Sequence, residues 1–180
     1  MRLLSLLLFP LTLAACSAGP EEPVTPPAEE AEPAQPAPAP VAAASNSPTQ
    51  GGDGSPIHLT ALIPADLEAN PLEGELGCHF VEEGKPLLVA MGNVADENGH
   101  AQGLAKIGDY TERLFAREAG GFDGLPDGAE FSGKGMTFTV TRTSDTPVGA
   151  GESPPYPAEL LAQRADGAER MIVGRWTCGP

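Results

Sequence analysis

The sequence predicts a mostly β domain, a small antiparallel barrel or sandwich of about eight short strands preceded by a disordered tether. Three observations lead to this prediction. Short runs alternate apolar or β-branched residues with polar ones, and turn sequences rich in Gly, Asn and Asp separate these runs at intervals of about 8 to 12 residues. A proline-rich segment without aromatic residues comes before them.

The chain begins as an exported protein does. A single basic residue, Arg2, precedes an apolar run from Leu3 to Leu13, and small residues end that run just before a cysteine. As a helix this run rises only about 16 Å, roughly half of the ~30 Å hydrocarbon core of a bilayer. We therefore expect a cleaved signal peptide rather than a permanent membrane span.

The signal ends in Leu13-Ala14-Ala15-Cys16, which resembles the lipobox of bacterial lipoproteins. The resemblance implies a signal peptide over residues 1–15, cleavage before Cys16, and attachment of lipid to its sulfur. Two or three acyl chains are enough for stable membrane attachment. Ser17 stands where an Asp would favour retention in the inner membrane of enterobacteria, so the resemblance favours the outer membrane. The alternative is an ordinary export signal with an incidental cysteine.

Residues 16–56 are expected to form a disordered linker behind the lipidated cysteine. From residue 17 on, this segment holds ten of the 20 prolines and six acidic residues, and it has neither basic nor aromatic residues. It cannot bury enough apolar surface to offset the entropy of ordering. A proline-rich recognition motif is the alternative interpretation.

Residues 57–180 are expected to form a single β domain, since 124 residues suit one modest core. The domain carries 19 acidic and 9 basic residues, a net charge of −10, without clusters of Lys or Arg among aromatic residues. Nucleic acid is therefore not expected as a partner. The acidic surface suits a cationic protein instead.

Two cysteines remain once Cys16 is used for lipidation, and an exported chain meets an oxidising compartment. We therefore predict a disulfide between Cys78 and Cys178. In the chain-entropy treatment, closing a loop of about 100 residues stabilises a fold by up to ~4.7 kcal/mol.

The first half of the domain is expected to contain one helix and four strands. Pro64 is placed to begin a short helix over residues 65–69. Residues 72–81 and 86–91 form a hairpin around the turn at 82–85, and two further strands follow the turn signature Asp96-Glu97-Asn98-Gly99. These two strands are expected at 103–107 and 110–115.

The second half is expected to contain four more strands. The clearest of the whole chain is 136–143, where Met136, Phe138 and Val140 alternate with threonines. Gly133-Lys134-Gly135 connects it to a strand at 129–132, after a glycine-rich loop at 120–128. A second loop at 144–157 precedes residues 158–164, which fit a strand or one helical turn, with context favouring the strand. Asp166-Gly167 then turns the chain into a last strand at 169–178.

A short internal repeat helps to place the ends of the domain. Gly74-Glu75-Leu76-Gly77-Cys78 and Gly174-Arg175-Trp176-Thr177-Cys178 repeat a glycine, an apolar residue and a cysteine at alternate positions, although chance is an alternative explanation. If the end strands run antiparallel with the cysteines opposite one another, Phe80 lies opposite Trp176. A parallel arrangement would bring Leu76 against Trp176 instead.

No pattern in the sequence predicts an enzyme, a metal site or a cofactor site. The histidines His58, His79 and His100 lack the spacing of zinc ligands, and the serines of the domain lack a nucleophile motif. The acidic pairs Asp96 with Glu97 and Asp123 with Asp127 lie among turn residues, where Asp is common. Calcium binding or glycoside cleavage by such a pair stays an alternative, although the spacing departs from a calcium loop.

A cysteine in the first strand, another in the last and about eight strands between them are similar to the membrane-bound lysozyme inhibitors of Gram-negative bacteria. The resemblance covers roughly residues 73–178. The inhibitory loop of that family contains Ser-Gly-x-x-Tyr, whereas this chain has Ser132-Gly133-Lys134-Gly135-Met136, so the resemblance implies a fold and no functional residue. The resulting hypothesis is a non-catalytic binding or interaction module in the cell envelope. An envelope-polymer hydrolase and a passive structural lipoprotein are the alternatives.

Overall fold

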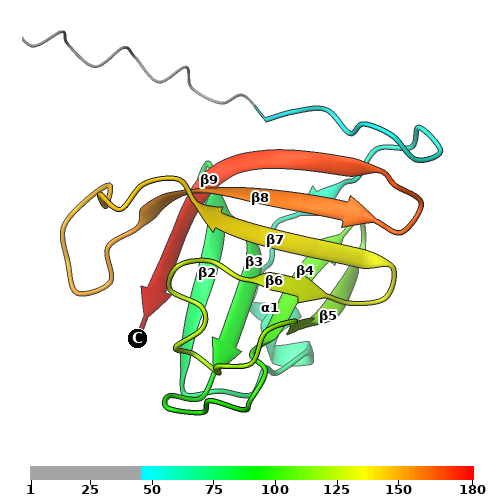
Figure 1. The fold of residues 1–180 in the computed structure, drawn as a ribbon. Helices are drawn as coiled ribbons and strands as arrows, with labels where there is room; N and C mark the ends of the chain where they lie inside the picture. The colour runs from blue at the N-terminus through cyan, green and yellow to red at the C-terminus, as the bar shows by residue number, and fades with distance from the viewer. Residues whose placement is uncertain (1–45) are drawn as a thin grey trace, which may run out of the picture. The chain divides into compact units, whose positions relative to one another are not determined.

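The structure, a computed structural model, describes residues 46–180 and shows a closed antiparallel barrel of eight strands, with a small helix beside it (Figure 1). The predicted fold class is therefore confirmed, and of its two forms the barrel is correct. The signal peptide, Cys16 and linker residues up to 45 lie outside the described residues. The elements are β1 (Leu59–Thr60), α1 (Pro64–Ala69), β2 (Leu76–Glu82), β3 (Lys85–Gly92), β4 (Gln102–Ile107), β5 (Tyr110–Ala116), β6 (Glu130–Ser132), β7 (Met136–Arg142), β8 (Tyr156–Arg164) and β9 (Glu169–Gly179).

Pairing of β2 with β9 links the first and last strands of the barrel. The two strands run antiparallel, with Cys78 opposite Cys178 and Phe80 opposite Trp176. The predicted disulfide joins Cys78 to Cys178, and the antiparallel register is correct. Neighbouring strands then follow in the order β4-β3-β2-β9-β8-β7-β6-β5, and pairing of β5 with β4 completes the circle.

The interior of the barrel is filled by the alternate residues of each strand. In β7, Met136, Phe138 and Val140 are buried, whereas the threonines between them are partly exposed, as the period of two predicts. Large side chains that are fully shielded from solvent include Trp176, Phe80, Phe131 and Phe138. This single core is the main source of stability for the barrel.

Helix α1 and the residue after it, Asn70, are tied to β4 and β5 by polar contacts. Lys106 on β4 forms a salt bridge with Asp66 at 2.9 Å, and Asn70 Nδ2 donates a hydrogen bond to Thr111 Oγ1 at 3.0 Å. Gly103 faces the interior of the barrel, so the next residue, Leu104, points outward. Leu104 is nevertheless fully buried. The segment that contains α1 therefore covers an apolar patch on the outside of the barrel.

Within the described residues, no helix is long and apolar enough to cross a bilayer.

Residues 46–56 differ from the prediction, which placed them in the disordered linker. Ser47 N–H donates to Met171 O at 3.0 Å, and Gln50 pairs with Glu169 at the start of β9. Composition alone could not show this, because the segment is held by backbone pairing with β9 and not by its own side chains burying apolar surface. In the structure, the linker prediction is therefore wrong for these eleven residues.

A charged cluster also fastens this N-terminal segment to the β8–β9 turn. Arg164 contacts Asp53 at 2.6 Å and Asp166 at 2.8 Å. Hydrogen bonds from Arg164 and from the Ala168 N–H lower the pKa of Asp166 far below its usual value. Hydrogen bonds from Ser55 lower the pKa of Asp53.

Two strand boundaries differ from the prediction for identifiable reasons. Strand β2 begins at Leu76 instead of residue 72, because Gly74 adopts a φ of +148° and its backbone lies closely against Gly92. Strand β8 begins at Tyr156, inside the predicted loop. Pro157 lacks an N–H, but its carbonyl still accepts a hydrogen bond from Thr143 N–H at 2.9 Å, so this proline is compatible with the strand.

Candidate functional site

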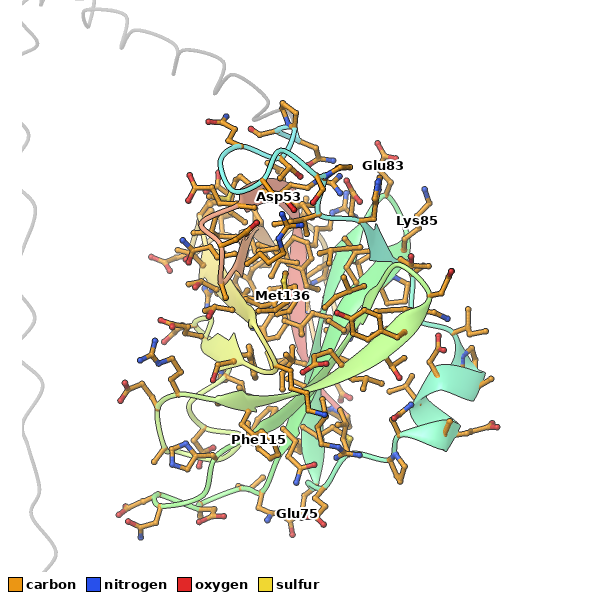
Figure 2. The ribbon with its side chains drawn as sticks, turned by 90° about the vertical axis from the view of Figure 1, so that its right-hand side faces the viewer. Asp53, Glu75, Glu83, Lys85, Phe115 and Met136 are labelled. Atoms are coloured by element: carbon orange, nitrogen blue, oxygen red, sulfur yellow. A yellow bond between two sulfur atoms is a disulfide. The ribbon has the colours of Figure 1, made fainter. Side chains whose placement is uncertain are left out.

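The two ends of the barrel differ in the length of their connections. At one end the connections are short, consisting of residues 83–84, 108–109, 133–135 and 165–168. We call this the hairpin end, and the N-terminal segment lies beside it. At the other end, here called the loop end, lie the longer segments 70–75, 93–101, 117–129 and 143–155, together with the C terminus. Figure 2 shows Asp53, Glu83 and Lys85 towards the hairpin end and Glu75 at the loop end.

The ends also differ in charge. The four loop-end segments contain nine carboxylates and one basic residue, Arg117. The four hairpin-end connections contain three carboxylates and one lysine. The longer loop-end segments therefore carry a net of eight negative charges, against two in the shorter hairpin-end connections. The nine carboxylates belong to Glu73, Glu75, Asp96, Glu97, Glu118, Asp123, Asp127, Asp145 and Glu152.

Several of these carboxylates hold the loops in place by accepting backbone hydrogen bonds. Glu75 accepts from Val94 N–H at 3.1 Å, Asp123 from Ala95 N–H at 2.8 Å, and Asp96 from Gly99 N–H at 2.9 Å. These contacts order the loops without neutralising the charge. Glu97 and Glu152 are exposed and have no hydrogen bond to the described residues, so they are free to interact with a partner.

A pocket of about 230 Å³ opens at the loop end, between the loops and the ends of β7, β8 and β9. Its walls are mostly apolar or aromatic. Trp176 is fully buried, and its Nε1–H donates to Leu125 O at 2.9 Å, which anchors the loop 117–129 to β9. The lining residues are Phe122, Pro126, Arg142, Glu152, Pro154, Tyr156, Trp176 and Cys178.

Arg142 is the basic residue of this pocket. Its guanidinium carbon lies 3.8 Å from the centroid of the Tyr156 ring, a cation–π contact. Its Nη1 contacts Asp127 at 2.7 Å and its Nη2 contacts Asp145 at 3.4 Å. Both carboxylates are almost fully exposed, whereas the side chain of Arg142 is only 14% exposed. The Nε of Arg142 is buried and has no hydrogen-bond partner among residues 46–180.

A larger cleft of about 410 Å³ lies at the hairpin end, where it is lined by Ile57, Ile107, Tyr110 and Met136. Met136 lies near the middle of the view in Figure 2. The charged residue Arg164 also lines this cleft, but it is already paired with Asp53 and Asp166. The cleft therefore presents apolar surface beside two charged residues, the paired Arg164 and the exposed Asp109.

Glu112 on β5 is the one buried charged residue in the part of the chain that the structure describes. Its Oε1 accepts a hydrogen bond from the backbone N–H of Lys134 in the β6–β7 turn. This contact continues the link between β5 and the β6–β7 hairpin beyond the last paired residues, Phe115 and Ser132. We therefore assign Glu112 a structural role.

The histidines do not come together in the structure. His58 lines the cleft at the hairpin end, His79 is exposed on β2, and His100 contacts Ala116 O through its Nδ1 at 2.8 Å. Residues 46–180 contain no group of three or more His, Cys, Asp or Glu side chains arranged to hold a metal ion.

The acidic pairs also separate by role. Asp123 supports the backbone at Ala95, whereas Asp127 pairs with Arg142. No motif in the sequence marks Arg142, Glu152 or Tyr156 as candidate residues. An isolated arginine at the end of a strand belongs to no recognisable sequence motif, and only folding brings it to Tyr156.

Comparison of the chain with protein-family models, curated protein sequences and solved structures finds no match.

Proposed function

We propose that this chain is a lipid-anchored lipoprotein of the bacterial cell envelope, in the outer membrane, whose barrel is a non-catalytic module that binds a cationic macromolecule through its loop end. The observation that carries the proposal is the charge of the loop-end segments, nine carboxylates against one arginine. Complementary charge raises the rate of encounter and selects among partners.

The position of these loops supports the same proposal. The chain enters the barrel at the hairpin end, where residues 46–56 pair with β9. An anchor at Cys16 would connect through this side, so the loop end would be free to meet a partner.

Anchoring predicts that Cys16→Ser releases the protein from the membrane or leaves it uncleaved, because the substituted chain cannot take lipid on its sulfur. The measurement is fractionation of cells that express either chain, combined with the mass of the N-terminal peptide. Ser17→Ala is the matched control and should stay in the membrane. A Cys16→Ser protein that is processed and still sediments with membranes would refute lipid anchoring.

Binding can be tested with the mature protein immobilised in detergent and lysozyme as a basic protein probe. Retention should be detectable at low salt and weaken as the Debye length falls from about 10 Å at 0.1 M to about 3 Å at 1 M. Glu97→Gln together with Glu118→Gln should weaken binding by about threefold to tenfold, in line with up to ~1 kcal/mol for each exposed ion pair.

Glu83→Gln together with Asp109→Asn is the matched control, because it removes the same charge from the hairpin end. Its affinity should stay within about twofold of the unchanged protein. Equal weakening by both double variants would assign the effect to net charge and not to the loop end. Absence of retention at low salt would contradict the proposed function, and turnover of peptidoglycan would favour the hydrolase alternative.

A further inference from the structure

The cleft at the hairpin end is the mouth of the barrel. Strands β4, β5, β7 and β8 each contribute to it the inward-facing residue nearest this end, which are Ile107, Tyr110, Met136 and Arg164. Ile57 and Met136 close its floor, at 3% and 5% exposure, whereas Tyr110 is 54% exposed. Ligand sites are commonly clefts of about 300–1,000 Å³ with apolar and aromatic walls, and barrel mouths are a frequent place for them. The cleft, at about 410 Å³, has this size and lining.

Main-chain groups that border the cleft are already hydrogen-bonded. Ile57 N–H donates to Thr49 Oγ1 at 2.7 Å, and the Ile57 carbonyl accepts from Arg170 Nη1 at 3.1 Å. Gly108 N–H donates to His58 O at 2.9 Å, and the Gly108 carbonyl accepts from a threonine hydroxyl on β1 at 2.7 Å. A buried peptide or sugar would need partners for its own polar groups, and these groups are not free to supply them. The cleft therefore suits a hydrocarbon group.

The charged residues at the rim favour a positive group beside that hydrocarbon. Arg164 lies 2.6 Å from Asp53 and 2.8 Å from Asp166, so two carboxylates already balance its charge. Asp109, in the β4–β5 turn, is exposed and forms no salt bridge within residues 46–180. The exposed ring of Tyr110 can also attract a cation to its face. A negative group would gain little from Arg164 and be repelled by Asp109, whereas a positive group would be attracted.

We infer that the cleft at the hairpin end binds a small amphiphile with a straight hydrocarbon chain and a positively charged amino head. The chain lies against Ile107 and Tyr110, over the floor formed by Ile57 and Met136. The head stays at the rim on the side of Asp109. This site is separate from the loop end, so it goes beyond the proposed binding of a cationic macromolecule and does not depend on it.

Three probes with the same chain test the charge of the head: octylammonium, 1-octanol and octanoate. Binding is measured by calorimetry on the whole mature chain with Cys16→Ser, because a chain without lipid needs no detergent that would compete for the cleft. Octylammonium should bind most tightly and octanoate most weakly, with about threefold to tenfold between them. Hexylammonium should bind about fourfold more weakly than octylammonium, since each methylene in a partly open cleft contributes about twofold.

Substitutions on β5 and in its preceding turn test the place of the site. Asp109→Asn should weaken octylammonium by about twofold to fivefold and leave 1-octanol unchanged. Tyr110→Ala should weaken both probes by at least about threefold. Phe115→Ala is the matched control, because it truncates an aromatic side chain of the same strand that is 48% exposed and lies outside the cleft. Tighter binding of octanoate than of octylammonium, or equal losses for Tyr110→Ala and Phe115→Ala, would overturn the inference.

Methyl resonances of the methionines locate the probe without any substitution in the barrel. Octylammonium should shift the resonance of Met136, on the floor of the cleft, and leave that of Met91 on β3 unmoved. A shift of Met91 with an unmoved Met136 would place the probe elsewhere and reject the inference. Glu97→Gln together with Glu118→Gln should leave octylammonium binding unchanged. Loss of lysozyme retention alone would reject the proposed function, and loss of octylammonium binding alone would reject the cleft.

Discussion

Replacing both cysteines, Cys78→Ala with Cys178→Ala, is expected to lower the free energy of unfolding by roughly 2 to 5 kcal/mol. The disulfide joins residues that are 100 apart in sequence and bridges β2 and β9, the strands whose pairing links the two ends of the barrel. Without the bond, the unfolded chain gains the freedom of a long open loop. Cys78 is also buried, so its replacement removes packing at the same place.

Urea denaturation followed by circular dichroism measures this loss. The reduced form of the unchanged protein should unfold at nearly the same urea concentration as the double variant, because both lack the same bond. Addition of reductant should not alter the double variant. A difference of less than about 1 kcal/mol between oxidised protein and double variant would show that strand pairing alone closes the barrel.

Trp176→Ala is expected to cost roughly 3 to 5 kcal/mol, the range for truncation of a large buried aromatic residue. Trp176 is fully buried opposite Phe80 and Tyr156, and its Nε1–H holds Leu125 O at 2.9 Å. The substitution therefore leaves a cavity and removes one of the two hydrogen bonds that Leu125 O accepts, the other coming from Gly128 N–H.

Two further variants divide this effect into its parts. Trp176→Phe retains most of the ring but loses the N–H, so its cost should lie well below that of the alanine variant. Phe115→Ala truncates an aromatic side chain that is 48% exposed and should change stability by less than about 0.5 kcal/mol. Similar losses for Trp176→Ala and Phe115→Ala would contradict the place of Trp176 in the core.

The strands of the domain were predictable because their signals are local. The alternation in Met136–Arg142 reflects a strand with one buried face, and the prediction extended it by only one residue. Pro64 starts α1 where expected, since a proline at the first helical position loses no hydrogen bond. The disulfide followed from counting cysteines, whereas the structure decided between the antiparallel and parallel pairings that the repeat around Cys78 and Cys178 left open.

Residues 46–56 and Tyr156 show where local signals mislead. Proline and glycine predict a loop when the chain is considered alone, yet an adjacent strand can pair with such a segment through the groups that remain. Ser47 donates to Met171, and Pro157 accepts from Thr143. Neither contact depends on a side-chain pattern, so the sequence of the segment contains no signal for it.

The sequence alone therefore determined the β class, the number and approximate position of the strands, the disulfide and the excess of negative charge. Each of these follows from period, composition or counting. Only the tertiary structure decided that the sheet closes into a barrel, that nine carboxylates lie in the loop-end segments, and that Arg142 stacks on Tyr156 beside a loop-end pocket. The physical reason is that these contacts join residues from different strands and loops, and their distances are set by how the strands pair and not by neighbours along the chain.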